Sequence, residues 1–257
     1  MAASPVRVAN PYVPRLVGVA TVIGALLAAE AIIRVGWISQ FIVPPPSEIA
    51  ASFGRLVAEE HIVWRFFYTV GECLVAGAMI TVCGVGIGVL MHRFRLLQLA
   101  CETWVAALAS APFVLAYPLF MVIFGRNAWT IIMMGFVSGL PPVILKTIEG
   151  ISGTRRVLVN VGRSFNLTGT QQFWKILFPA AMPTIFVGIR LGLIFALINI
   201  VGTEFLINFG GLGQLITDLA ERYDLAGTYA AICFVILVSV CFFVTLERVE
   251  RWLRPVD

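Results

Sequence analysis

Long apolar segments constrain the fold of this chain more than any other feature. Residues 16–33 are apolar except for Thr21 and Glu30, and five more apolar segments follow. About 20 apolar residues suffice for a helix to cross a bilayer, and in lipid the backbone polar groups must be satisfied within helices or closed barrels. We therefore predict an all-α, polytopic membrane protein with about six transmembrane helices. The expected spans are residues 16–33, 68–91, 100–124, 128–146, 183–206 and 228–246.

Composition supports this prediction and excludes other classes. The chain is 60% hydrophobic and 12% charged, whereas soluble domains are about 45–50% apolar and about 25% charged. The five cysteines form no CxxC pair and the two histidines have no ligand spacing, which argues against a disulfide framework or a metal site. The net charge of +4 comes from loop arginines and does not indicate nucleic-acid binding.

We expect a cytosolic N-terminal arm at residues 1–15 and a single transmembrane domain at residues 16–257. Residues 16–33 have a second interpretation as a secretory signal, because Ala29-Glu30-Ala31 resembles a small-x-small cleavage site. The sequence leaves open whether this first span is retained.

The segment 47–66 is predicted to be an amphipathic helix on the outer membrane surface. A stiff Val43–Pro46 connector precedes it, Ser47 is the expected N-cap, and Ile49, Phe53 and Leu56 share one apolar face.

Prolines and glycines mark special places within the spans. Pro112 and Pro118 are expected to bend the third span, and the Pro141-Pro142 pair to break the fourth. Small residues at helical spacing, such as Gly84 with Gly88 and Gly188 with Gly192, predict close helix packing.

The polar interval between the fourth and fifth spans, residues 147–182, contains two short helical patterns. Thr168 and Gln171 form a capping-box pattern at the start of the second one. Pro179 and Pro183 are expected to end this helix and to begin the next span. We interpret residues 160–183 as a rigid docking loop for another protein; the alternative is an ordinary connecting loop.

Few ionisable residues lie within the spans. Glu72, Arg190 and Glu204 are the candidates, and no carboxylates are paired along the sequence. Arg190 either faces the bundle interior or extends to the headgroups. Glu204 is expected to order the turn near Asn208 rather than to carry protons. With Pro112, Arg190 and Glu204 are weak candidates for the translocation path.

The distribution of Lys and Arg predicts the orientation. With both termini in the cytoplasm, twelve of the 18 basic residues lie on the inner side and Arg190 lies within a span. The five on the outer side are Arg34, Arg55, Arg65, Arg126 and Arg222. The loop 147–182 then faces the cytoplasm.

Catalytic motifs are missing from the sequence. It has no GxxxxGK[ST] phosphate loop, no HExxH and no GxSxG pattern, so the sequence does not indicate an enzyme.

From about residue 40 to 253, the chain resembles the nitrate/taurine/aliphatic-sulfonate permease family of ABC importers. The resemblance is carried by the docking loop and by segments in the family's order. These segments are Val43-Pro-Pro-Pro-Ser-Glu-Ile, Ser110-Ala-Pro, Gly188-Ile-Arg-Leu-Gly, Thr203-Glu-Phe-Leu and Gly210-Gly-Leu-Gly.

The resemblance implies an ABC type I importer permease fold in the bacterial inner membrane, surrounded by lipid. It implies two ABC ATPase subunits, which would bind ATP and Mg, a second permease copy or a sister permease, and a periplasmic substrate-binding protein. No cofactor is expected in this chain. The solute would be a small anion or zwitterion, such as a sulfonate, taurine or nitrate.

The docking loop resembles the family's EAA loop, which couples the permease to the ATPase. Asn160 stands at the position of the family's Glu, Val161 and Gly162 at the alanines, and Asn166 at the glycine. All four positions depart from the pattern, although Asn tolerates a left-handed turn better than most residues. The expected coupling residues are Asn160, Val161, Gly162, Arg163, Asn166, Leu167, Thr168 and Phe173. The alternative function is a standalone channel or secondary transporter that uses Arg190 and Glu204.

Overall fold

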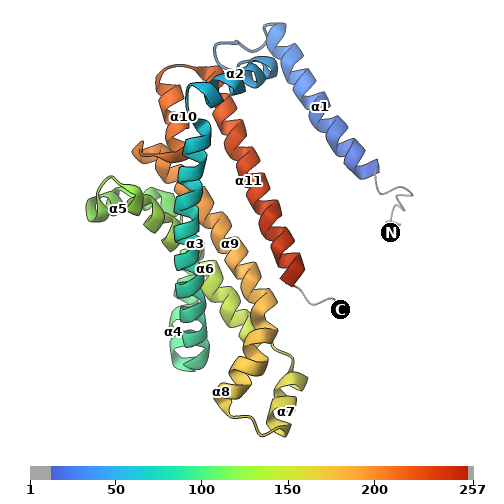
Figure 1. Cartoon of the computed structure of the whole chain (residues 1–257), viewed down its shortest axis with the longest axis vertical. Helices are drawn as coiled ribbons and strands as arrows, with labels where there is room; N and C mark the ends of the chain where they lie inside the picture. The colour runs from blue at the N-terminus through green and yellow to red at the C-terminus, as the bar shows by residue number, and fades with distance from the viewer. Residues whose placement is uncertain (1–12, 254–257) are drawn as a thin grey trace.

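A computed structural model describes residues 13–253, and this part of the chain contains helices and connecting turns without strands (Figure 1). The helices are α1 (Val13–Arg34), α2 (Pro46–Ala58), α3 (Ile62–Arg93), α4 (Arg95–Ala109), α5 (Tyr117–Phe124), α6 (Ala128–Ser152), α7 (Arg156–Ser164), α8 (Gly169–Gln172), α9 (Phe178–Ile207), α10 (Gly211–Glu221) and α11 (Leu225–Leu253). A 3₁₀ turn, η1 (Phe113–Ala116), precedes α5, and a π-helical turn, η2 (Phe173–Leu177), precedes α9.

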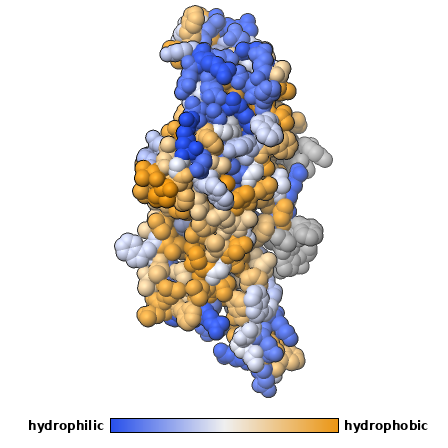
Figure 2. Space-filling view, turned by 60° about the vertical axis from the view of Figure 1, so that its left-hand side comes forward, coloured by the Kyte–Doolittle hydropathy of each residue, from blue (hydrophilic) through white to orange (hydrophobic). Residues whose placement is uncertain are grey.

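The predicted all-α membrane architecture is confirmed. Within the described residues, α1, α3, α6, α9 and α11 are long and apolar enough to cross a bilayer. The pair formed by α4 and residues 113–124 would make a sixth span, bent by 91°. Figure 2 shows the corresponding surface, with an apolar belt between hydrophilic ends.

The central bundle consists of α3, α6 and α9, which pack closely through glycines. A Cβ on Gly88 would lie 2.6 Å from Thr147 on α6, and one on Gly84 would lie 2.7 Å from Val143. Where α6 crosses α9, a Cβ on Gly139 would lie 2.5 Å from the carbonyl oxygen of Gly192. Small residues let helices approach closely where lipid supplies no hydrophobic driving force.

The bend predicted in the third span is present at Pro112, because the chain turns by 91° between α4 and residues 113–124. Pro118 adds no bend, since it lies in the first turn of α5 and starts that helix. The break predicted in the fourth span is absent. In α6, Pro141 and Pro142 are buried within an unbroken helix. Packing against neighbouring helices supports the backbone where the prolines remove N–H donors.

The prediction of an amphipathic helix over residues 47–66 was wrong in its boundaries. The helix α2 ends at Ala58, and Ile62–Phe66 belong to α3. Ser47 does not cap α2, since Pro45 is the N-cap residue. Instead, the Ser47 hydroxyl donates to Glu30 Oε1 at 2.8 Å and joins α2 to α1.

Helix α1 differs from the rest in how little it packs. Nearly all its described side chains are exposed, including Leu16, Leu27 and Val22. Its contact with the bundle runs through α2, where Glu30 also pairs with Arg34 at 2.6 Å. Of the predicted N-terminal arm, residues 1–12 lie outside the described part, and Val13–Arg15 belong to α1.

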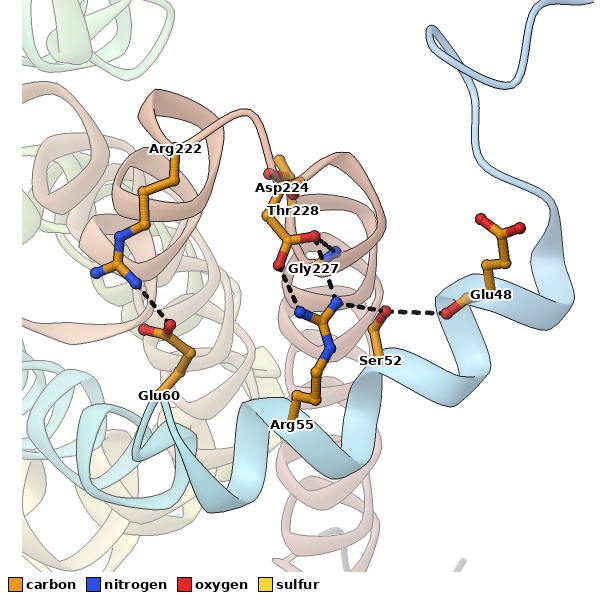
Figure 3. Close-up of polar contacts among 8 residues, drawn as sticks. All are labelled: Glu48, Ser52, Arg55, Glu60, Arg222, Asp224, Gly227 and Thr228. Carbon is orange, nitrogen blue, oxygen red and sulfur yellow. Dashed lines mark hydrogen bonds and ion pairs between the residues drawn. The ribbon is translucent and has the colours of Figure 1, made fainter.

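Ion pairs tie α2 and the start of α3 to α10 and α11. Figure 3 shows Arg55 of α2 against Asp224, with Nη1 and Oδ2 at 3.3 Å, and Arg222 against Glu60 at 2.7 Å. Arg65 of α3 also meets Asp218 of α10 at 2.8 Å. Exposed pairs stabilise by only about 0–1 kcal/mol each, so they mainly set the relative positions of these helices.

The two ends of the bundle carry different elements. Helices α2 and α10 lie at one end, and α7 and α8 lie at the other (Figure 1). The start of α1 and the end of α11 point toward the α7 end. Helix α11 continues beyond the predicted end of the last span, residue 246, as far as Leu253.

Replacing Gly139 by Val should weaken the crossing of α6 and α9. The added side chain meets backbone and Ile80, and overpacking of this kind costs about 1–3 kcal/mol. We expect the apparent melting temperature of the detergent-purified protein to fall by about 5 °C. Gly71→Val is the matched control, because a Cβ at Gly71 meets nothing within 4 Å. Equal melting temperatures for both variants would contradict the assigned crossing.

Candidate functional site

The segment between α6 and α9 forms a compact projection, which we call the knob and define as residues 156–177. Its first helix, α7, ends in a reverse turn at Asn166, whose φ is 50°. The N–H of Leu167 donates to Gly162 O at 3.1 Å and that of Asn166 to Arg163 O at 2.9 Å. This pattern is a Schellman motif. The predicted left-handed conformation at Asn166 is thus present.

The second helix of the knob begins with the predicted capping box. The N–H of Gln171 donates to Thr168 Oγ1 at 3.3 Å, and the N–H of Thr168 donates to Gln171 Oε1 at 3.0 Å. Two backbone N–H groups at the start of α8 are satisfied in this way. The turn between the helices is therefore ordered at both sides.

The two halves of the knob pack against each other at Gly162. This residue is buried, and a Cβ on it would lie 2.7 Å from Ile176 and 3.3 Å from Gln172. The Gln172 side chain also donates to Val159 O at 3.0 Å. A small residue at position 162 is needed for this contact, which explains why Gly can stand at a position where the family pattern has alanine.

The knob is continuous with a transmembrane helix, contrary to the prediction for Pro179 and Pro183. Helix α8, the π turn η2 and α9 follow one another without a break. Pro179 lies in the first turn of α9, directly after the π turn, and Pro183 lies within α9. The loop expected at residues 147–182 is also shorter, because α6 reaches Ser152 and α9 begins at Phe178.

One side of the knob exposes apolar side chains. Val157 is 71% exposed and Phe165 75%, and Leu158 and Val161 are also exposed. We call Val157, Leu158, Val161 and Phe165 the apolar face of α7. Of the predicted coupling residues, only Val161 belongs to it. The i, i+4, i+8 spacing of Val157, Val161 and Phe165 was a usable signal in the sequence.

The other predicted coupling residues have different positions. Asn160, Arg163, Asn166 and Thr168 are exposed on the knob, and Leu167 is half-buried. Phe173 is half-buried beneath the knob, with its ring 5.2 Å from that of Trp174 and 5.9 Å from that of Phe178. Phe173 also packs on the cluster of Ile151, Ala181 and Ile185, so it joins the knob to the bundle.

Arg190 lies within α9 and pairs with α11. Its Nη1 is 2.8 Å from Glu250 Oε2, and the side chains are 20% and 4% exposed. The guanidinium also lies 5.7 Å from the ring centroid of Phe243. Of the two interpretations of Arg190, the one in which its side chain faces the bundle interior therefore fits the structure. Its partner there is Glu250.

Glu204 is fully buried and holds the turn after α9, as predicted. Thr69 Oγ1 of α3 donates to Glu204 Oε1 at 2.7 Å, and the N–H of Gly213 donates to Oε2 at 2.8 Å. A Cβ on Gly211 would overlap the same carboxylate. Glu204 therefore joins α3, α9 and α10.

A second buried carboxyl group lies beside Glu204. Glu72 of α3 is 4% exposed and interacts with Glu204, although no donor group reaches its oxygens with hydrogen-bond geometry. This pair could not be predicted from the sequence, because the two residues lie on helices far apart along the chain. The expectation of unpaired carboxylates within the spans was wrong.

Pro112 lies apart from Arg190 and Glu204 in the fold. It precedes η1 at the sharp turn between α4 and α5, and it is exposed. The nearby 3₁₀ turn contacts α6 and α9. The three weak candidates for the translocation path thus lie in three separate places. Pro112 lies at the turn before η1, Arg190 lies between α9 and α11, and Glu204 lies near the end of α9.

Comparisons with known proteins agree with this architecture. A family model described as "Binding-protein-dependent transport system inner membrane component" matches residues 80–255. The nitrate import permease protein NrtB of Synechocystis is 24% identical over 266 residues, covering 98% of this chain and 96% of that protein. The permease SsuC of Bacillus subtilis, named for aliphatic sulfonates transport, is 26% identical over 204 residues, covering 79% and 74%.

A solved structure shares the fold. An inward-facing MetNI methionine ABC transporter aligns with a TM-score of 0.64 at 20% identity, covering 76% of this chain and 95% of that chain. With the family model matching more than half of the sequence, the assignment is direct. The chain belongs to the family of inner-membrane components of binding-protein-dependent transport systems, the ABC importer permeases.

Proposed function

We propose that this permease is driven by two ABC ATPase subunits, which bind ATP and Mg and dock on the knob. It pairs with a second copy or a sister permease and receives its solute from a periplasmic binding protein. The observation that carries the proposal is the apolar face of α7, which is exposed at the hydrophilic end of the molecule. Exposed apolar groups rimmed by polar residues are typical of protein-binding surfaces.

The contacts of the knob support a mechanical role. A force on α7 passes to η2 through the contact of Gly162 with Ile176 and through the bond from Gln172 to Val159. From η2 the backbone continues directly into α9, which packs on α6 at its glycines. Closure of the ATPases would therefore shift α9 and open a path toward the cytoplasm.

The orientation in the membrane follows from charge. Arg155, Arg156, Arg163 and Lys175 lie in or beside the knob, and cytoplasmic segments carry an excess of Lys and Arg. We place the knob and both termini in the cytoplasm of a bacterial cell and α2 with α10 at the periplasmic side. The ion-paired α2–α10 end then faces the binding protein.

The proposed solute is a small anion or zwitterion, such as a sulfonate, taurine or nitrate. The names of the relatives support this class, since SsuC is named for aliphatic sulfonates and NrtB for nitrate. Both relatives are less than 30% identical to this chain, so the proposal extends to the chemical class and not to one compound.

A standalone channel or secondary transporter is not favoured. That function would need Arg190 or Glu204 as a mobile ion or proton group. Arg190 is paired with Glu250, and Glu204 accepts hydrogen bonds from Thr69 and Gly213. In an assay with the ATP pool depleted and the ion gradient intact, we expect uptake to stop, whereas retained uptake would favour the channel or secondary transporter.

Replacing Val161 by Asp should uncouple ATP hydrolysis from transport. The exposed position tolerates the charge in the isolated permease, but burying it unpaired against an ATPase costs about 2–5 kcal/mol. We expect uptake in cells, and transport-stimulated ATPase activity in proteoliposomes, to fall at least about tenfold.

The matched control for this variant is Val161→Leu, which keeps the apolar surface and should keep both activities. Equal membrane levels of the two variants would exclude a folding defect. If Val161→Asp transported at the wild-type rate with coupled hydrolysis, the ATPase would not dock on the apolar face of α7.

The ion pair between Arg190 and Glu250 gives a test of the alternative function. Arg190→Glu alone places two acids together in a partly buried site, and breaking such a pair costs about 3–5 kcal/mol. We expect loss of stability and uptake, and recovery of both in the double variant Arg190→Glu, Glu250→Arg, measured by thermal unfolding and solute uptake. Stability restored without uptake would assign Arg190 a direct role in transport.

A further inference from the structure

An apolar groove runs beside the knob along α3 and α9. Its volume is about 440 Å³, and its lining is almost entirely apolar. The lining includes Val85, Gly86 and Val89 of α3 and Phe178, Met182 and Phe186 of α9. Gly86 is exposed, and a Cβ on it would meet nothing within 4 Å. The floor of the groove at Gly86 is thus open space at the depth of the membrane-spanning helices.

A second hollow adjoins the groove at the knob end. Its volume is about 480 Å³, and it shares Val89, Phe173 and Trp174 with the groove. Polar groups enter its lining here, namely His92, Arg93 and Thr170. The apolar groove and the polar hollow therefore adjoin, and we treat the polar hollow as the mouth of the groove.

The charge of the mouth is positive. Arg93 is exposed and forms no ion pair with any described residue. No Asp or Glu lines either hollow. The imidazole Nδ1 of His92 lies 3.2 Å from Ser152 Oγ on α6, which positions the ring at the mouth. An anionic group is the complement of this site.

Trp174 marks the boundary between the two parts. It is 60% exposed and lines both hollows. Tryptophan is enriched at the headgroup level of membranes, because its ring is apolar and its N–H is polar. The polar mouth then lies at headgroup level and the groove at the level of the acyl chains.

We propose that this site binds an anionic phospholipid, with the phosphate at Arg93, His92 and Thr170 and one acyl chain in the groove at Gly86. Basic pockets between transmembrane helices on the cytoplasmic side bind anionic headgroups. The proposal relies on the cytoplasmic placement of the knob given above. A bound lipid touches Phe173 and Trp174, so the lipid composition of that leaflet acts on the knob directly.

A membrane lipid fits the site better than a protein partner does. The groove opens at the depth of the spans, where a lipid arrives by lateral diffusion. A soluble protein that docks at the knob would have to send an apolar segment into the bilayer to fill it. A second permease copy that covered the groove would exclude lipid from it, and the titration below would then show no difference between the groove variant and its control. The apolar face of α7, which we assign to the ATPase, does not include any residue that lines the groove or its mouth.

The proposal can be tested by native mass spectrometry of the purified permease titrated with phosphatidylglycerol or phosphatidylcholine. We expect one tightly bound phosphatidylglycerol per chain and weaker retention of phosphatidylcholine. Arg93→Gln should weaken phosphatidylglycerol binding about fivefold, as expected for one basic residue near a membrane surface. Gly86→Leu fills the groove and should weaken binding of either lipid about tenfold, because each displaced methylene loses its burial.

Two controls match these variants. Arg248→Gln removes an exposed arginine at the same end of the bundle, outside the site. Gly71→Leu makes the same change in α3 at another open position. Both should retain the wild-type affinity. The proposal is overturned if phosphatidylcholine binds as tightly as phosphatidylglycerol, or if Arg93→Gln and Gly86→Leu bind like their controls. Since no ATPase is present, this result is independent of the coupling experiment on Val161.

Discussion

The close approach of α6 to α9 and α3 is the constraint on which the rest of the structure depends. In a bilayer the apolar side chains gain nothing from leaving lipid, so helices associate through close packing and polar contacts. Glycines allow this close approach, because Gly139 packs against Gly192, and Gly84 and Gly88 pack against α6. The knob extends from α6 and α9, and the turn at Glu204 begins where α9 ends.

Under the proposed function, the knob would transmit force because it is fixed to the bundle in two ways. Its two halves are fixed to each other by the Gly162 contact and the Schellman turn at Asn166. Its second half is one continuous helical segment with α9. A flexible linker at Pro179 would have absorbed a displacement of α7. The uninterrupted backbone carries such a displacement into the membrane.

Much of this architecture could be predicted from local signals in the sequence. The apolar segments predicted the spans, and Thr168 with Gln171 predicted the capping box, because both signals act within a few residues. The predictions for Pro141, Pro142, Pro179 and Pro183 failed because packing overrides a proline that removes only one or two hydrogen bonds.

The parts of the site that could not be predicted depend on distant segments meeting. Glu250 as the partner of Arg190 and Glu72 beside Glu204 require knowledge of which helices are neighbours. The apolar face of α7 was visible in its spacing, yet the resemblance to the family's loop directed attention to Asn160 and Gly162, which lie outside that face. Only Val161 belongs to both sets.

The polar contacts also divide the bundle into parts that move together and parts that are free. Glu204 joins α9 to α3 and α10 at one end, and the pair of Arg190 with Glu250 joins α9 to α11. A displacement that enters α9 from the knob is therefore shared by α3, α10 and α11. Helix α1 is attached through Glu30 and Ser47, and α4 is separated from α5 by the 91° turn at Pro112. We expect relative motion during transport at the turn of Pro112, because α4 and α5 are not one continuous helix there.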